Sequence, residues 1–279
     1  MREAIAAGRF YEDGKNELKK QLEECFKGLK YDKKRVYGMI APHAGYSYSG
    51  KCAGFSYNQI RESNADIFLI LGVNHTGLGS EFTTLMEDFE TPLGIAEVDK
   101  EFGKELMKKF PGLKNDFTAH MNEHSIEAQL PFLQYIKNDF KFLPVLVSTI
   151  DLHLIKKFAE SVVEVSKELK KNVIIIASSD FTHYGENYGF LPFKEDIKKN
   201  LYKLDRGAIE FILKLDSKGF LDYINKTGAT ICGMCTIISC IEIVKLLGAK
   251  KGVLLNYYTS GDVVNDYKNA VGYASVNFE

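Results

Sequence analysis

VIIIASSDFTHYG, residues 173–185, begins as an uninterrupted apolar run and ends in serine, aspartate, threonine and histidine. Short continuous apolar runs are typical of strands that are buried on both faces of a parallel sheet. In open parallel sheets, ligands bind just beyond the carboxyl ends of the strands. The stretch therefore predicts a buried strand that opens into an active-site edge at Ser178, Ser179, Asp180 and His183.

Two other predicted strands end in the same way. VYGMIA (36–41) runs into His43, and IFLIL (67–71) runs into His75. One histidine after a strand is usually only a polar loop residue. Three histidines at three strand ends would gather at one edge of a parallel sheet, and neutral imidazoles are ligands for iron, zinc and copper. No two of the three have the i, i+4 spacing of a helical metal motif, so the fold has to bring them together.

The rest of the chain alternates apolar strands with amphipathic helices. The periodicity predicts these further elements: helices at 15–29, from about residue 50, at 99–110, 151–169 and 233–248, and strands at 141–148, 252–258 and 270–278. This alternation predicts an α/β fold: one domain over residues 1–279, with a mainly parallel sheet covered by helices on both faces. Residues 76–97 show little periodicity apart from short β segments near Phe82–Leu85, which leaves a lid and an edge hairpin as alternatives. We expect this segment, with Phe89, to be mobile relative to the sheet.

Composition and charge argue against several classes of function. The net charge is -1, and no basic stretch alternates with aromatic residues, so nucleic acid is not an expected partner. No apolar run reaches the ~20 residues that span a bilayer, and residues 1–14 lack the apolar core of a signal peptide. We therefore expect a cytoplasmic protein with no membrane partner. The five cysteines do not form a disulfide framework and are expected to be reduced.

Cys232 stands immediately before the predicted apolar helix. A thiol at a helix N-terminus has a lowered pKa, which predicts a thiolate that binds metal or reacts. Cys232 and Cys235 also form a C-x-x-C pair, which leaves a redox dithiol and half of a zinc ribbon as alternatives. Cys240, Cys25 and Cys52 are assigned to packing, as is Cys235 if neither alternative holds.

The other polar candidates come from shorter-range spacing. His124 and Glu127 lie one turn apart on a predicted helix, as an acid/base pair or as part of a surface turn. Asp180 precedes His183 by three residues, so it is predicted to orient that imidazole or to bind metal. The remaining histidines are predicted to lie at the surface: His120 and His153.

Five ordered motifs together resemble the MEMO1 family, the mediator-of-ErbB2-driven-cell-motility proteins. They are APHAGYSYSG (41–50), LGVNH (71–75), EHSIEAQLPFL (123–133), SSDFTHYG (178–185) and ICG (231–233). That family in turn resembles the LigB-type class III extradiol dioxygenases, which use a non-haem Fe(II). The resemblance implies a LigB/MEMO-like fold and a metal cleft that receives a small molecule or a peptide.

The resemblance also implies roles for individual residues. His43 and His75 match the two histidine ligands. His183 matches the acid/base histidine of the dioxygenases, which in MEMO1 proteins is also treated as a metal ligand. Cys232 stands where the dioxygenases have a glutamate ligand. The remaining matches are polar residues that line the same pocket: Asp180 and His124.

The thiol of Cys232 in place of a carboxylate bears on the expected chemistry. Two histidines and a carboxylate suit Fe(II), whereas a thiolate keeps the single negative charge but favours copper or zinc as well. Our leading hypothesis is a redox enzyme of dioxygenase type with a divalent metal, Fe(II) before Cu or Zn, on His43, His75 and Cys232, with His183 as proton shuttle or fourth ligand. A non-catalytic module that binds a peptide or partner in the same cleft is the alternative, and a zinc hydrolase is the second. The sequence does not predict an oligomeric state.

Overall fold

The apolar run at 173–178 forms β8 (Val173–Ser178), and all of its residues are buried in the computed structural model, which describes residues 1–279. β8 lies between β1 (Gly38–Ala41) and β2 (Ile67–Val73), and β2 pairs in turn with β7 (Lys141–Val147). All three pairings are parallel. Branched apolar side chains fill both faces of these strands, which is the pattern of a sheet covered on both sides.

Outside this centre the sheet is mixed: β6 pairs parallel with β3 and β5 parallel with β7, but the other outer pairings are antiparallel. β11 (Asn269–Phe278) pairs antiparallel with β1, β10 and β9, while β3 pairs antiparallel with β7 and β4 with β5. The remaining strands are β3 (Phe82–Thr84), β4 (Phe89–Thr91), β5 (Gly94–Val98), β6 (Leu113–Asn115), β9 (His183–Gly185) and β10 (Gly252–Thr259). The result is one mixed eleven-stranded sheet with a parallel centre. The predicted α/β fold class is confirmed.

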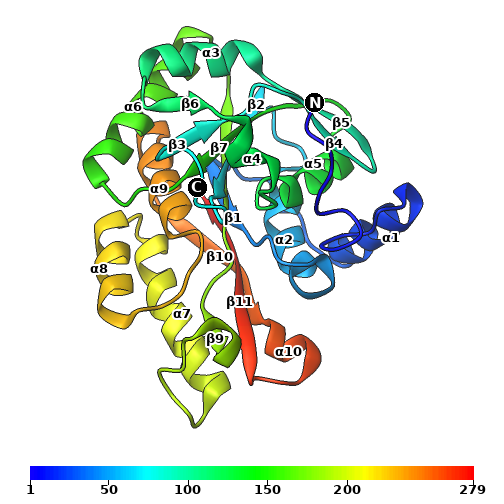
Figure 1. The fold of residues 1–279 in the computed structure, drawn as a ribbon, viewed down its shortest axis with the longest axis vertical. Helices are drawn as coiled ribbons and strands as arrows, with labels where there is room; N and C mark the ends of the chain where they lie inside the picture. The colour runs from blue at the N-terminus through cyan, green and yellow to red at the C-terminus, as the bar shows by residue number, and fades with distance from the viewer.

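Helices cover both faces of this sheet (Figure 1). α9 packs on β8, β1 and β2 with α6 beside it, and α2 packs on the opposite face together with α1 and α5. The helices are α1 (Lys15–Phe26), α2 (Tyr46–Ile60), α3 (Lys100–Lys109), α4 (Phe117–Met121), α5 (Leu130–Ile136), α6 (Leu152–Glu168), α7 (Ile197–Leu213), α8 (Ser217–Thr227), α9 (Met234–Leu247) and α10 (Ser260–Val264), with short 3₁₀ turns η1 (Glu127–Gln129) and η2 (Glu186–Tyr188). None of them combines the length and the apolar character needed to pass through a bilayer.

α2 begins at Tyr46, earlier than the expected start near residue 50. The stretch looked like a loop because it is rich in glycine and serine. Two glycines of α2 allow α1 to pack closely. A Cβ on Gly50 would lie 2.6 Å from the sulfur of Cys25, and a Cβ on Gly54 would lie 2.5 Å from the Cys25 carbonyl oxygen. Close helix packing, rather than a turn, explains the small residues here.

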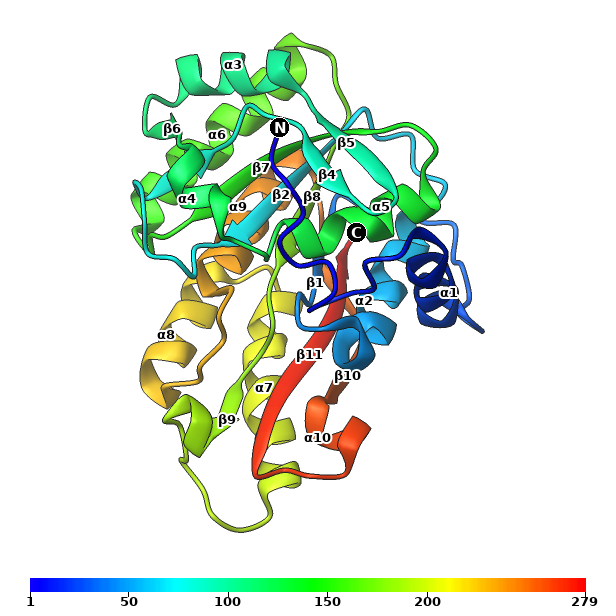
Figure 2. The ribbon, with the colours of Figure 1, turned by 45° about the vertical axis from the view of Figure 1, so that its right-hand side comes forward.

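Of the two alternatives for 76–97, the lid is wrong and the edge hairpin is confirmed, because β4 pairs antiparallel with β5. This segment contains β3, β4 and β5, and the Phe89 side chain is only 1% exposed, packed edge-on against Phe142. Strands of three to five residues contain too few repeats for a period-two pattern to be recognised. The N-terminal segment runs along β4 and then crosses towards the loop before α2 (Figure 2).

Candidate metal centre

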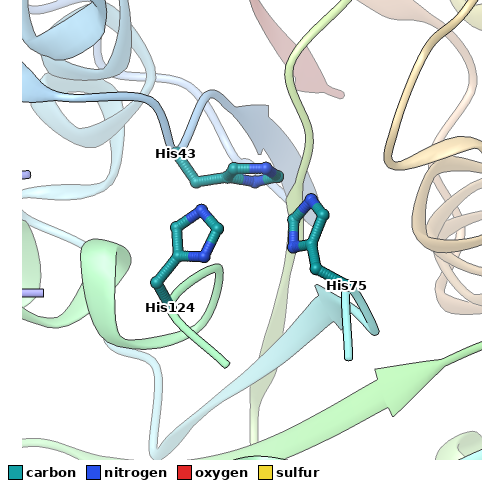
Figure 3. Close-up of side chains that lie close together, drawn as sticks. All are labelled: His43, His75 and His124. Atoms are coloured by element: carbon teal, nitrogen blue, oxygen red, sulfur yellow. The ribbon is translucent and has the colours of Figure 1, made fainter. Parts of the chain in front are cut away.

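Three parallel strands deliver polar residues to one edge of the sheet. Ala41 at the end of β1 pairs with Ser178 at the end of β8, and Leu71 near the end of β2 pairs with Ala177. His43, Asp180 and His75 follow these strand ends directly, as the sequence predicted. A fourth residue, His124, reaches the same place from the loop between α4 and η1 (Figure 3).

The three imidazoles of His43, His75 and His124 face one another (Figure 3). The rings of His43 and His75 lie 5.3 Å apart and nearly perpendicular, and those of His75 and His124 lie 4.9 Å apart and stacked. Each residue offers a donor nitrogen, and all three nitrogens lie within 4.8 Å of one another. The arrangement can hold a metal ion.

The hydrogen bonds of His43 fix which of its nitrogens can bind a metal. The hydroxyl of Ser178 donates its single hydrogen to the carbonyl of Ser125 and accepts one bond from the Gln129 amide. His43 Nδ1, at 2.9 Å from the same oxygen, must therefore be the protonated nitrogen, and Nε2 keeps its lone pair. Burial, with a smaller effect from the charge on His75, lowers the pKa of His43 to about 3, so the ring is neutral at physiological pH.

His75 is held in the same tautomer by Glu123. One carboxylate oxygen of Glu123 lies 3.0 Å from His75 Nδ1, and the other accepts the backbone N–H of His75 at 2.6 Å. Burial alone would raise the pKa of Glu123, but the hydrogen bond and charge of His75, with the N–H of Ser125, lower it to about 2. An ionised carboxylate only accepts, so His75 donates from Nδ1, and Nε2 is the nitrogen it can offer to a metal. A carboxylate that orients a histidine in this way is typical of metal sites.

Cys232 and Asp180 form a second group with His43. The sulfur of Cys232 lies 3.3 Å from His43 Nε2, and donor atoms of His43, Asp180 and Cys232 all lie within 4.8 Å. Asp180 accepts hydrogen bonds from the backbone N–H groups of His43 and Ala44. Because Nδ1 of His43 carries the proton, Nε2 is its only ligand atom, and one ion can use it at a time. The two groups therefore share a single ion, which can take its other ligands from either group.

The predicted low pKa of Cys232 is wrong. Cys232 precedes α9 as expected, but burial raises the pKa of its thiol well above the ordinary value, with Asp180 adding to the effect. The N–H groups at the start of the helix do not compensate for the loss of solvent. All five cysteines are free thiols, as the sequence predicted, and the C-x-x-C pair is not a disulfide.

His183 lines the same cleft but belongs to neither compact group. Its ring Nδ1 lies 3.1 Å from the carbonyl of Thr230, which can only accept, so Nδ1 carries a proton and Nε2 is the nitrogen that can exchange one. Thr230 orients this ring, where Asp180 was expected to do so. The cleft measures about 480 Å³, contains four histidines, and has aromatic walls and no lysine or arginine.

Two further expectations about polar residues are wrong. His120 was expected at the surface, but it is 1% exposed and its ring packs beside Thr83 of β3. Glu127 was expected to pair with His124 or to face solvent, but it is fully buried and pairs with Arg2. His153 is exposed, as predicted.

The sequence reasoning missed Glu123 as a site residue. Glu123 is 2% exposed and orients His75 from 48 positions away in the chain. The available signal was its position in EHSIE, directly before a histidine that was already a candidate. The residues that hold Glu123 in place, above all Arg2, gave no local signal.

The fold and the site together define an α/β protein with a candidate metal centre at the carboxyl edge of its parallel strands. The chain belongs to the Memo-like protein family, because the family model with that description matches residues 2–277. The family resemblance of the five sequence motifs is thereby confirmed.

Individual relatives match over the same length. The MEMO1 family protein MK0963 of Methanopyrus kandleri is 40% identical and aligns with 99% of this chain and 98% of its own. A MEMO1 family protein of Nitrosopumilus maritimus is 36% identical, with 100% and 99% covered. Among solved structures, uncharacterized protein JW3007 from Escherichia coli K12 superimposes with a TM-score of 0.54, covering 88% of this chain and 100% of its own, at 10% identity. At that identity the likeness concerns the fold alone.

Proposed function

We propose that this protein is a metal-dependent enzyme that carries out dioxygenase-like oxidation of a small molecule in the histidine-lined cleft. The observation that carries the proposal is the shared tautomer of His43 and His75. Both rings donate Nδ1–H to a fixed acceptor, so Nε2 is the atom that each can offer to a metal. This is how proteins prepare neutral imidazoles as metal ligands.

His43 and His75 would hold the metal, with His124 or Cys232 as the third ligand. When bound, Fe(II), or alternatively copper, supplies a redox-active Lewis acid at the end of the cleft. Cys232 ligates only as the thiolate, and burial raises its pKa, so His124 is the ligand that needs no proton removed. A softer ion such as Cu(I) would favour the thiolate.

His183 is the proposed proton-transfer residue. It lines the cleft beside the other histidines, and its Nδ1 bond to Thr230 leaves Nε2 free to take or give a proton. The Tyr188 ring meets its imidazole edge to face at 5.1 Å and restricts its rotation. An imidazole that is held through one nitrogen and exchanges a proton at the other is suited to general acid–base catalysis.

Metal content tests the proposal. Protein purified without oxygen or added metal should contain iron or copper near one equivalent by elemental analysis. His75→Ala should lose it, and His153→Ala, which changes an exposed histidine, should retain it. His124→Ala and Cys232→Ala distinguish the two candidates for the third ligand, because only the variant that lacks this ligand should bind the ion more weakly. Oxygen uptake with a panel of catechols would then test the oxidation itself.

Two other functions have one observation each in their favour. Three histidines around one ion are also the ligand set of hydrolytic zinc enzymes. Zinc as the only metal, with no oxygen uptake, would favour that hydrolase. The mouth of the cleft carries the exposed side chains of Tyr48, Tyr188 and Val264, which suit a peptide or partner. No metal in any sample, before or after reconstitution, would reject the enzyme and favour this binding module.

A further inference from the structure

Arg2 is a buried arginine that holds a loop of the candidate metal centre. Its side chain is 2% exposed and lies over the ring of Phe89. Its Nε donates to the carbonyl of His120 at 2.9 Å, and its Nη2 donates to the carbonyl of Glu123 at 2.6 Å. The backbone of Arg2 is itself fixed to β4, because it hydrogen-bonds Asp88 and Glu90 on either side of Phe89. Arg2 therefore joins the loop at 120–127 to the sheet.

Glu127 closes the same loop from its other end. One oxygen of Glu127 accepts Arg2 Nη1 at 2.6 Å and the N–H of Ile5 at 3.0 Å. The other oxygen accepts the N–H of Ala6 at 2.8 Å and the hydroxyl of Tyr11 at 2.5 Å. Every donor in this group comes from residues 2–11. A fully buried carboxylate with four donors is far more restrictive than an exposed ion pair.

Two residues of this loop, Glu123 and His124, belong to the metal centre. Glu123 orients His75, and His124 is one of the clustered imidazoles. Phe10 stacks on His124 with ring centres 4.3 Å apart, and its carbonyl accepts the N–H of Tyr46 next to the His43 loop. The segment 2–11 thus contacts the elements that carry His43 and His124, and it reaches His75 through Glu123.

We propose that residues 2–11 position the histidine cluster, with Arg2 as the principal positioning residue. Glu123 and His124 stand on a loop rather than on a strand, so no sheet ladder fixes them. Arg2 replaces that ladder by binding two carbonyls of the loop and the carboxylate at its end. The inference uses the proposed metal only as one readout, and its first test needs no metal.

The first test is hydrogen exchange of the metal-free protein. Arg2→Met should speed exchange of the amides of His75, Glu123 and Ser125 by ~10-fold or more, because their acceptors depend on this loop. The matched control is Lys171→Met, which breaks an ion pair with the buried Asp99 at the opposite end of β8. Faster exchange only around 75 and 120–129 supports the proposal. Equal acceleration throughout the molecule, or none at these amides, overturns it.

The second test is metal binding with the conservative variant. For Arg2→Met we expect a Zn²⁺ dissociation constant raised about 10- to 100-fold, with an altered visible spectrum of the Co²⁺-loaded protein. Arg2→Lys keeps the charge opposite Glu127 but cannot reach both carbonyls, so its effect should be intermediate. Lys171→Met should stay within about two-fold of the wild type.

These outcomes separate the inference from the proposed function. Unchanged Zn²⁺ affinity and Co²⁺ spectrum in Arg2→Met, with stability lowered as in Lys171→Met, would show a merely structural arginine. If no variant binds metal, the proposed function fails, and hydrogen exchange alone decides the positioning role. Arg2→Lys retains the buried charge pair, so it provides both readouts even if Arg2→Met does not fold.

Discussion

The candidate metal centre has two halves that are built in different ways. His43 and His75 follow β1 and β2, whose backbones are fixed by parallel pairing with β8. Glu123 and His124 stand on a loop that is fixed by Arg2 and by the buried carboxylate of Glu127. In the first half neighbouring strands set the geometry, and in the second half side chains from the other end of the chain set it.

The two halves can lose a metal ligand through different substitutions. A ligand at a strand end is lost only when the ligand itself is changed, because the strand is held in place by the large apolar core around the sheet. A loop ligand can be displaced by changing a residue that never touches the metal.

Removing His43 should have the largest effect. His43 belongs to both compact donor groups, so His43→Ala should abolish binding of one equivalent of metal whichever group is used. His124→Ala removes a member of one group only and should leave weaker binding through Cys232 and Asp180. Isothermal titration with Zn²⁺ and Cu(I) compares the two variants. Equal retention of metal by both would contradict a site centred on His43.

Removing the anchor carboxylate should cost more stability than any exposed charge. Glu127→Ala leaves the guanidinium of Arg2 buried at 2% exposure without its partner, which costs about 3–5 kcal/mol of unfolding free energy. Glu160→Ala, at an exposed position on α6, should change it by less than about 0.5 kcal/mol. Urea unfolding of both variants measures the difference. A loss below about 1 kcal/mol for Glu127→Ala would mean that the loop rearranges to repair the pair.

The strand-borne half was predictable from the sequence, and so was most of the fold. The apolar runs of β1, β2, β7 and β8 predict buried parallel strands, and the carboxyl ends of such strands share one edge of the sheet. The short strands β4 and β5 have no such apolar run, because their burial depends on β7 and on the N-terminal segment. Periodicity reports only what a segment does over its own length.

In the loop-borne half His124 was a candidate from the family resemblance, but the contacts that hold its loop were not predictable, for a physical reason. Arg2 and Glu127 are 125 positions apart, and neither has a neighbour in sequence that indicates a buried charge. An arginine near the start of a chain and a glutamate in a helix-like turn both suggest exposed residues. The same long-range contact places the carbonyl of His120 against Arg2, in a part of the loop where the sequence indicated only surface. Such pairs are recognised in three dimensions only.

The orienting charge of Glu123 should appear as acid sensitivity. Its pKa in the folded protein is about 2, below the ordinary 4.5, so the ionised carboxylate stabilises the fold above about pH 4.5. That contribution, up to about 3 kcal/mol, is lost as the pH falls from about 4.5 to about 2. Unfolding free energies between pH 2 and 6 should therefore fall less steeply for Glu123→Gln than for the wild type. Glu160→Gln serves as the control and should follow the wild-type curve.

The smallest effect should come from the ring that joins the two halves. Phe10 stacks on His124 from the N-terminal segment, and aromatic pairs of this kind contribute about 1 kcal/mol beyond the area they bury. Phe10→Leu keeps an apolar side chain but removes the stack, so Zn²⁺ affinity should fall only a few-fold, mainly through a faster off-rate. Tyr48→Leu is the matched control, because Tyr48 lines the same cleft without a ring contact to His124. If both variants weaken Zn²⁺ binding equally, the shape of the cleft matters and the stack does not. If Phe10→Leu weakens it as strongly as Arg2→Met, the ring rather than the buried charge holds the loop, and the contrast between the two halves rests on a single contact.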